Sequence, residues 1–563
     1  MSANVTGRGS ADVTDQGSAD VADGGSDGAA DRGSGGGTGR EGGEVTVTGG
    51  ASAAVARSRA VAVVGTGTMG QGIAQVALVA GHPVRLYDSA PGRAEEAAKA
   101  LAVRLDRLVA KGRMDATARE EALGRLHPAR DLAELADAAL VVEAVVELLP
   151  VKQRLFADLE EVVADDTVLA TNTSSLSVTA VAGGLRLPGR FVGLHFFNPA
   201  PLLPLVEVVS GFATDPDVAT RAYATVKGWG KTPVRCADTP GFIVNRIARP
   251  FYAEALRVFE EGAADPATID AALRESGGFR MGPFELTDLI GQDVNEAVTR
   301  SVWESFYQDP KFTPSLAQRR LVESGRLGRK TGRGWFSYAE GTEPPAPHTA
   351  PLAEAPKRIA VRGDLGPAEP LVGLFEAAGI QVRRKGGNGY VLLPGGGRLC
   401  LADGETSFEY DTDEIVYFDL ALDYARATRI VLSTREGTSE ETLAEAVGLF
   451  QAVGKRVSVI GDVPGMIVAR TVAMLADLAA DAVDRGVATA EDVDTAMRLG
   501  VNYPAGPLEW AAKLGHARVR ELLDALHERY PTGRYAPSLA TARRAYADAT
   551  DDAETAEDAQ EPR

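Results

Sequence analysis

Two short apolar runs between residues 190 and 210 each carry one titratable residue among branched and aromatic side chains. FVGLHFF contains His195, LPLVEVV contains Glu207, and a loop rich in proline separates them. Runs of this length and composition, bounded by turn-forming residues, predict buried or half-buried strands. A carboxylate that held one ring nitrogen of the histidine would leave the other as a base near neutral pH. An isolated histidine on such a run is more commonly a satisfied core residue, so the two strands alone leave both interpretations open.

The segment from residue 59 to 88 follows the order strand, glycine turn, amphipathic helix, strand. In such a turn Gly65 would allow a tight bend, Gly67 a close approach of the backbone to a pyrophosphate, and Gly70 close packing of helix on strand. Asp88 ends the second strand, where it would accept a hydrogen bond from a ribose 2′-hydroxyl and repel a 2′-phosphate. The alternative interpretation is an ordinary glycine-rich turn. The spacing instead predicts a dinucleotide-binding site that prefers NAD to NADP.

Two later strand ends carry polar residues. DAALVVEAVVE ends at Glu147, and TVLATNTSSL runs into Ser174. Because ligands of open α/β sheets lie at the carboxyl ends of the strands, we expect both residues to converge with Gly65 and His195. The commoner use of such a serine is a helix N-cap or a turn, and that of such a glutamate is a helix acid stabilised by the dipole.

From residue 238 the pattern becomes helical, and this helical pattern occurs twice. DTPGFIVNRIARPFY recurs as DVPGMIVARTVAMLA at a constant offset of 224 residues, so that Arg246 becomes Arg470. Asn245 lies one turn into the first of these helices, where its amide could face either a cleft or solvent, and Ala469 replaces it in the second copy. Residues 357–461 show strand and helix patterns without a glycine motif, which predicts a shortened α/β module without a competent cofactor site.

The chain therefore reads as an α/β protein with a duplicated all-α domain. The expected segments are a disordered tail at 1–58, a Rossmann-type NAD-binding domain at 59–237, a helical domain at 238–338, a linker at 339–356, a degenerate α/β module at 357–461, a second helical domain at 462–546 and an acidic tail at 547–563.

Composition narrows the class of partner. The first 58 residues repeat Gly, Ser, Ala and Asp with almost no large apolar side chain, which predicts disorder. We find no signal-like segment and no apolar run long enough to span a bilayer, so we expect a cytoplasmic protein without membrane contact. The net charge of −19, or −15 without the tail, argues against a nucleic-acid partner. Cys236 and Cys400 are far apart and no histidines cluster, so neither a disulfide nor a metal site is predicted.

The chain resembles the L-3-hydroxyacyl-CoA dehydrogenases in five motifs, which are, in order, GTGTMGQGIA, VVEAVVE, TNTSSL, HFFNPAPLLPLVEVV and TPGFIVNR. The resemblance covers about residues 59–338 and implies a helical domain like that of 6-phosphogluconate dehydrogenase. It makes His195 the general base and Glu207 the acid that orients it. It implies that Ser174 and Asn245 hydrogen-bond the reacting substrate. The implied cofactor contacts, beyond the glycine motif and Asp88, are Met69, Glu147, Lys152, Ser174 and Asn198.

The function that this resemblance implies is the NAD-dependent oxidation of an L-3-hydroxyacyl-CoA in the degradation of fatty acids or related acyl-CoA esters. Hydride loss from a secondary alcohol needs a base for the hydroxyl proton, which fits His195. One alternative is a redox-silent NAD-binding protein with a structural or sensory role, but the base, its orienting acid and both oxygen ligands are all retained. Another is a dehydrogenase of a 3-hydroxy acid without CoA, which normally relies on a lysine base.

The duplication also predicts an arrangement of the helical domains. In the simpler members of the family, one helical domain pairs two identical subunits. The longer bacterial members, which include 3-hydroxybutyryl-CoA and 3-hydroxyadipyl-CoA dehydrogenases, carry the duplicate. We therefore expect the domain at 238–338 to pack against its own copy within one chain, with a single active site that the copy covers without touching substrate.

Overall fold

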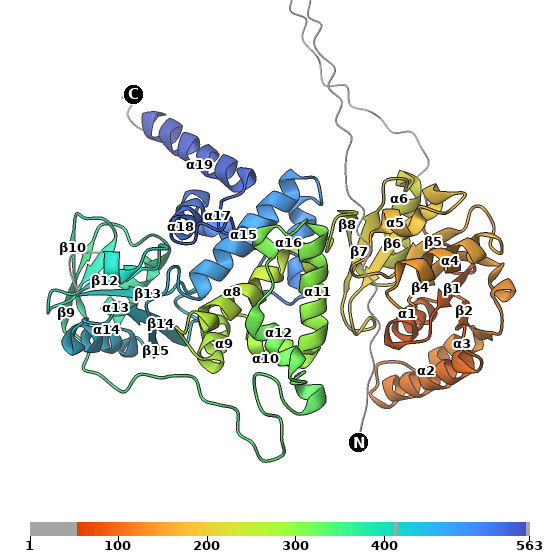
Figure 1. The fold of residues 1–563 in the computed structure, drawn as a ribbon, viewed down its shortest axis with the longest axis horizontal. Helices are drawn as coiled ribbons and strands as arrows, with labels where there is room; N and C mark the ends of the chain where they lie inside the picture. The colour runs from red at the N-terminus through yellow and green to blue at the C-terminus, as the bar shows by residue number, and fades with distance from the viewer. Residues whose placement is uncertain (1–52, 410–413, 559–563) are drawn as a thin grey trace, which may run out of the picture. The chain divides into compact units, whose positions relative to one another are not determined.

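The computed structural model describes residues 53–409 and 414–558, and its ribbon shows two sheets, each followed along the chain by a group of helices (Figure 1). Most of the segment expected to be disordered, residues 1–52, lies outside the described residues. Val55 already belongs to the fold, because it is buried and its N–H donates to Thr225 Oγ1 at 2.9 Å. The packed chain therefore begins before residue 59, the boundary expected from sequence.

The first sheet, drawn in red to yellow in Figure 1, has the strand order β3-β2-β1-β4-β5-β6-β7-β8. Its strands are β1 (Ala60–Val64), β2 (Val84–Tyr87), β3 (Leu126–Ala129), β4 (Ala138–Glu143), β5 (Val168–Thr171), β6 (Phe191–Phe196), β7 (Leu205–Ser210) and β8 (Thr232–Ala237). Neighbours run parallel except β6 and β7, which are antiparallel. The Rossmann-type prediction is confirmed. Strand β3 is not predicted from the sequence, because its few residues lie in a region with helical periodicity.

Helices cover both faces of this sheet, which explains why its central strands are apolar on both sides. Val61 and Val63 of β1 pack in one core with Ile73 of α1, whereas Ala62 and Val64 face a second core that contains Phe156 of α4. The helices are α1 (Thr68–Val79), α2 (Arg93–Ala110), α3 (Ala116–Gly124), α4 (Leu149–Glu160), α5 (Val178–Ala182) and α6 (Pro216–Gly228).

The helical domain that follows contains α7 (Val244–Ile247), α8 (Arg249–Glu260), α9 (Pro266–Glu275), α10 (Pro283–Ile290), α11 (Gln292–Ser305) and α12 (Leu316–Glu323). It begins with a tight turn in which Gly241 and Phe242 have positive φ, and α7 starts two residues later. Asn245 consequently lies in the first turn of α7 and not one turn into the helix.

The second sheet is mixed, with the order β10-β9-β11-β12-β13-β14-β15, and packs around a core of its own. Its elements are β9 (Arg358–Arg362), α13 (Pro370–Ala377), β10 (Gln381–Lys385), β11 (Tyr390–Leu392), β12 (Arg398–Leu401), β13 (Ile415–Phe418), β14 (Arg429–Thr434), α14 (Glu440–Ala452) and β15 (Arg456–Gly461). This agrees with the shortened α/β module expected from the sequence. Its two helices leave it with far less helical cover than the first sheet has.

The second helical group consists of α15 (Val468–Asp484), α16 (Ala490–Gly500), α17 (Pro507–Leu514), α18 (His516–Arg529) and α19 (Leu539–Asp558). The long helix α15 packs against α8 of the first group. Helix α19 continues past residue 546, so the acidic segment expected as a tail from 547 begins inside a helix. Within the described ranges, none of the helices combines the length and apolar character needed to cross a bilayer.

Candidate active site

His195 and Glu207 lie directly opposite each other on the antiparallel strands β6 and β7. Residues opposite each other in such a pair project from the same face, so the register brings the two side chains together. The His195 Nδ1 lies 2.6 Å from Glu207 Oε2, and the glutamate side chain is 0 % exposed. A carboxylate only accepts hydrogen bonds, so Nδ1 carries the proton and Nε2 is the nitrogen left for the cavity that His195 lines.

The second oxygen of Glu207 fixes the entrance to the helical domain. Glu207 Oε1 accepts the backbone N–H groups of Ile243 at 3.0 Å and Val244 at 2.9 Å, at the start of α7. Asn245 follows at once, and its Nδ2 donates to the backbone oxygen of Ser174 at 3.3 Å. One buried carboxylate therefore orients the histidine and also holds the helix that carries the asparagine.

Glu147 anchors the loop after β5 that contains Ser174. Glu147 Oε1 accepts from Thr173 Oγ1 at 2.5 Å and from the N–H groups of Ser174 at 2.9 Å and Ser175 at 3.1 Å. Burial alone would raise the pKa of Glu147, but the Lys152 ammonium and the Thr173 hydroxyl hold it below its ordinary value. The carboxylate is therefore ionised at neutral pH.

The N-cap interpretation of Ser174 is wrong. The residue that caps α5 is Ser177, whose Oγ accepts from Ala180 N at 3.1 Å. Ser174 instead lies on the loop between β5 and α5, where it lines the cavity beside His195. Its side chain is consequently available for a ligand in a way that a capping serine would not be.

Lys152 lies deeper than a ligand contact would suggest. Its Nζ donates to Glu143 Oε1 at 2.6 Å and lies 3.2 Å from Glu147 Oε2, and the lysine side chain is 1 % exposed. Glu143, which also accepts from Thr171 Oγ1 at 2.7 Å, is not among the residues predicted from sequence. The signal for it is an acid inside the otherwise apolar VVEAVVE run. Lys152 therefore acts on the cavity through Glu147.

The glycine motif has the geometry that a pyrophosphate needs. Gly65 has φ of +98°, and a Cβ there would lie 2.5 Å from Ala144 O. A Cβ on Gly70 would lie 1.8 Å from Gly65 O, so only glycine permits this contact of turn and helix. At Gly67 a Cβ would meet nothing within 4 Å, and no side chain caps α1 there. The open space and free amides at this helix N-terminus fit the phosphates of NAD.

Asp88 closes the same site at the end of β2. Its Oδ2 accepts from Thr66 N at 3.0 Å and Thr66 Oγ1 at 2.6 Å, and its Oδ1 accepts from Ala90 N at 3.0 Å. Burial alone would raise the pKa of Asp88, but these hydrogen bonds, led by that from the Thr66 hydroxyl, lower it. An ionised carboxylate next to the glycine turn suits a ribose hydroxyl and disfavours a 2′-phosphate.

A cavity of about 510 Å³ joins most of the predicted polar residues. Those that line it are Glu147, Ser174, His195, Asn198 and Asn245, and the predicted cofactor contact Met69 lines it as well. The lining also includes residues that are not predicted from the sequence, among them Phe197, Arg249, Tyr252 and Val501. The Phe197 ring lies 4.4 Å from that of His195, measured between centroids. Val501 follows α16, so the second helical group forms part of the wall, although we expected it to lie away from the substrate.

The chain matches three family descriptions. Residues 60–239 match "3-hydroxyacyl-CoA dehydrogenase, NAD binding domain", and residues 241–338 and 465–556 both match the C-terminal domain of the same family. Residues 399–464 match "3-hydroxybutyryl-CoA dehydrogenase reduced Rossmann-fold domain". The duplicated helical domain and the reduced α/β module thus each have a counterpart.

Individual relatives extend this similarity over most of the chain. The chain is 43 % identical over 486 residues to the 3-hydroxyadipyl-CoA dehydrogenase of Escherichia coli, covering 86 % of this chain and 97 % of the relative. It is 41 % identical over 282 residues to a Mycobacterium tuberculosis 3-hydroxybutyryl-CoA dehydrogenase, covering 49 % of this chain and 98 % of that one. The crystal structure of an Escherichia coli 3-hydroxybutyryl-CoA dehydrogenase matches with a TM-score of 0.80 at 42 % identity, covering 88 % of this chain and 99 % of that one.

Proposed function

The chain belongs to the 3-hydroxyacyl-CoA dehydrogenase family, and on this premise we propose that it oxidises L-3-hydroxyacyl-CoA to 3-oxoacyl-CoA with His195 as the base. The observation that carries the proposal is the buried His195–Glu207 pair, whose histidine faces a cavity shared with Ser174 and Asn245. The enzyme is an NAD-dependent oxidoreductase, in keeping with its NAD-binding domain. The acyl-CoA ester is its substrate, and the degradation of fatty acids or related esters is the proposed setting.

NAD bound along the glycine turn would supply the hydride acceptor. The protein supplies the base, because Nε2 of His195 can take the proton from the 3-hydroxyl group as the carbonyl forms. Glu207 holds Nδ1 at 2.6 Å and stabilises the imidazolium that results. Since Glu207 is fully buried, its charge acts on the ring in a medium of low dielectric, where it is worth more than in water.

Two further groups fix the position of the reacting oxygen. Ser174 offers a hydroxyl and Asn245 an amide on the wall of the cavity that His195 lines. The loop that carries the serine is held by Glu147, and the asparagine is held at the start of α7 by Glu207. Such restraint lets both groups orient the substrate before reaction, which is how enzymes convert binding into rate. Movement of the helical domain towards the sheet would complete the site.

The second helical domain takes the place of a partner subunit in this proposal. Arg246 Nη2 donates to Asp481 Oδ2 at 2.7 Å, and Arg470 Nε donates to Glu254 Oε2 at 2.9 Å, so each copy contributes an arginine to the other. These contacts support pairing within one chain. The cytoplasmic location expected from the sequence stays a prediction.

The experiment that tests the function is a turnover assay that follows NADH at its absorbance band. We expect NADH from L-3-hydroxybutyryl-CoA and NAD, and none from free 3-hydroxybutyrate, because the CoA moiety provides the binding energy that orients the alcohol. Turnover of the free acid would favour a dehydrogenase that does not need CoA. Binding of NAD without turnover of any 3-hydroxyacyl-CoA would favour the redox-silent alternative.

A further inference from the structure

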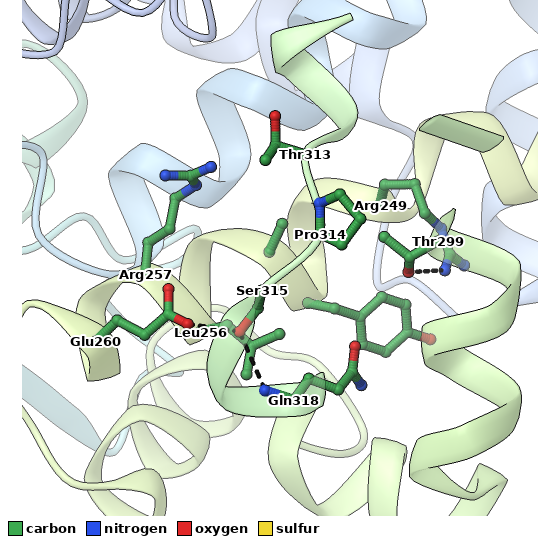
Figure 2. A pocket seen from close by; sticks show the side chains of 11 residues that line it. Arg249, Leu256, Arg257, Glu260, Thr299, Thr313, Pro314, Ser315 and Gln318 are labelled. Atoms are coloured by element: carbon green, nitrogen blue, oxygen red, sulfur yellow. Dashed lines mark hydrogen bonds between the residues drawn. The ribbon is translucent and has the colours of Figure 1, made fainter. Parts of the chain in front are cut away.

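A buried arginine on the wall of the catalytic cavity has no carboxylate partner among the residues that the structure describes. Arg249 is 5 % exposed. Its Nε donates to Asn245 O at 2.9 Å and its Nη1 to Thr299 Oγ1 at 3.1 Å, the second of which is drawn in Figure 2. The Tyr252 ring centroid lies 5.1 Å from the guanidinium carbon. Burial lowers the pKa of Arg249, and the groups that oppose this are tyrosines, Tyr252 and Tyr503.

Arg249 is the exception among the buried arginines of the described residues. The others each pair with a carboxylate: Arg190 with Glu160, Arg246 with Asp481, Arg429 with Glu275, and both Arg470 and Arg534 with Glu254. A buried charge is costly unless it is paired, so proteins seldom keep one without a reason. The neutral acceptors around Arg249 satisfy part of its hydrogen-bonding capacity and none of its charge.

The duplicated domain separates the role of Arg249 from the packing of its helix. At the offset of 224 residues, Arg246 is retained as Arg470, which is also buried and ion-paired. Arg249 becomes Ala473, just as Asn245 becomes the alanine four residues earlier. The arginine that joins the two copies is thus present in both. Arg249 is instead present only in the first copy, whose helices α7 and α8 line the catalytic cavity.

The walls around Arg249 suit a chain with a charged end. The catalytic cavity is lined between its polar groups by apolar side chains, including Ile290, Val294 and Val298 of the first helical domain and Val501 of the second. Arg249 and Tyr252 line both this cavity and the small neighbouring one drawn in Figure 2. Methylene groups would therefore pack on apolar surface, and an anion beyond them would meet the guanidinium.

We propose that Arg249 binds a carboxylate at the far end of the acyl chain, so that the preferred substrates are CoA esters of 3-hydroxy dicarboxylic acids. The inference rests on the proposed function. Nη2 donates to no oxygen within the described ranges, and together with Nη1 it presents the planar pair of N–H groups that matches a carboxylate. A methyl group at the same place would leave the buried charge unpaired, which is how such a site rejects an uncharged analogue.

The test compares two six-carbon esters that differ only at the far end, 3-hydroxyadipyl-CoA and 3-hydroxyhexanoyl-CoA. We expect the wild-type chain to prefer the dicarboxylic ester in kcat/KM. Arg249→Met should lower the ratio of the two kcat/KM values by roughly 10²-fold, mainly through KM for the dicarboxylic ester. Arg249→Lys should retain part of the preference, because it keeps the charge and loses the planar fork.

Arg257→Met provides the matched control. Arg257 lies further along α8 and lines the small cavity in Figure 2 but not the catalytic one, so its removal should leave the ratio unchanged. Equal loss with both esters in Arg249→Met would assign the arginine to the CoA moiety or to folding and overturn the proposal. An unchanged ratio, or a wild-type preference for the hexanoyl ester, would overturn it as well. Failure of the proposed function would show separately, as absence of NADH with both esters in the wild type.

Discussion

Glu207 of the first α/β domain and Asp419 of the second hold the same part of the following helical domain. Glu207 accepts the backbone amides of residues 243–244, and Asp419 accepts those of residues 467–468, which are the same positions in the duplicate. Only Glu207 also meets a histidine, His195. Burial raises the pKa of Asp419 to about 6 despite its amide donors. In both halves a buried carboxylate thus joins the sheet to the following helix. Only the first half also has a histidine that can serve as a catalytic base.

The two helical copies differ in a complementary way. Arg246 and its equivalent Arg470 both form ion pairs with the opposite copy. Asn245 and Arg249, which line the catalytic cavity, have alanines as their equivalents. The arginine that joins the copies is therefore kept in both, whereas the asparagine and the arginine that line the cavity are kept in one. The second copy nonetheless reaches the site through Val501, so it forms part of the wall as well as the cover.

The largest effect is expected from removing the histidine that distinguishes the two halves. His195→Gln removes the imidazole base, the group that distinguishes the surroundings of Glu207 from those of Asp419. We expect kcat to fall by roughly 10² to 10⁴ while NAD still binds, since the glycine turn is untouched. Turnover assays and NAD titration by fluorescence measure the two quantities. A variant that keeps near-wild-type turnover would remove His195 from the mechanism.

The contact between the helical copies is tested through Glu254. This residue of α8 is fully buried and accepts from Arg470, Arg534 and Tyr535 of the second copy. Burial alone would raise its pKa, but the guanidinium groups of Arg534 and Arg470 lower it to about 2. Glu254→Gln removes the carboxylate that pairs with Arg534 and leaves Arg470 with Glu261 alone, so we expect a loss of about 3–5 kcal/mol in the free energy of unfolding at neutral pH.

The sign of the pH dependence follows from that lowered pKa. A carboxyl group whose pKa falls on folding stabilises the protein fully above its unfolded value of 4.5 and loses this contribution as the pH falls towards 2. The difference between wild type and Glu254→Gln should therefore shrink on acidification. Urea unfolding at about pH 7 and about pH 3 measures it. A difference that is equal at both values would mean that the ion pairs contribute little.

The comparison of the two carboxylates can be sharpened by matched amide substitutions. Glu207→Gln and Asp419→Asn each weaken the contact of a sheet with a helix, so both should lower the melting temperature. Only Glu207→Gln should also reduce kcat, by roughly 10- to 10²-fold, and alter its pH profile, because only Glu207 stabilises the imidazolium. Equal effects of the two substitutions on kcat would show that Glu207 acts through the fold alone.

The smallest effect is expected on the choice of cofactor. The first α/β domain has a glycine motif, and the second α/β module lacks one. Asp88→Ala should narrow the preference for NAD over NADP by about tenfold, because it removes a hydrogen bond and a repulsive charge together. NAD titration of the wild type should saturate at one equivalent per chain. Equal use of both cofactors by the wild type would contradict the role of Asp88, and a second equivalent would mean that the degenerate module binds NAD.

The sequence by itself determined the parts of this protein whose signals are local. The glycine spacing from Gly65 to Gly70, the strand that ends at Asp88 and the apolar runs around His195 and Glu207 each follow from short-range periodicity and turn chemistry. The repeat at a constant offset exposed the duplicated domain in the same way. The α/β fold, the cofactor and the family could be predicted from these signals alone.

Only the tertiary structure decided what depends on contacts between distant segments. Whether Lys152 faces a ligand or is buried between Glu143 and Glu147 depends on how α4 packs against β4. No pattern near Arg249 shows that it lacks a carboxylate partner within the described part of the chain, because such a partner could have come from any element. Val501 reaches the cavity from a domain more than two hundred residues downstream of β7. The burial of a side chain and its ion pairs depend on neighbours that are remote in sequence. Local periodicity contains no information about those neighbours.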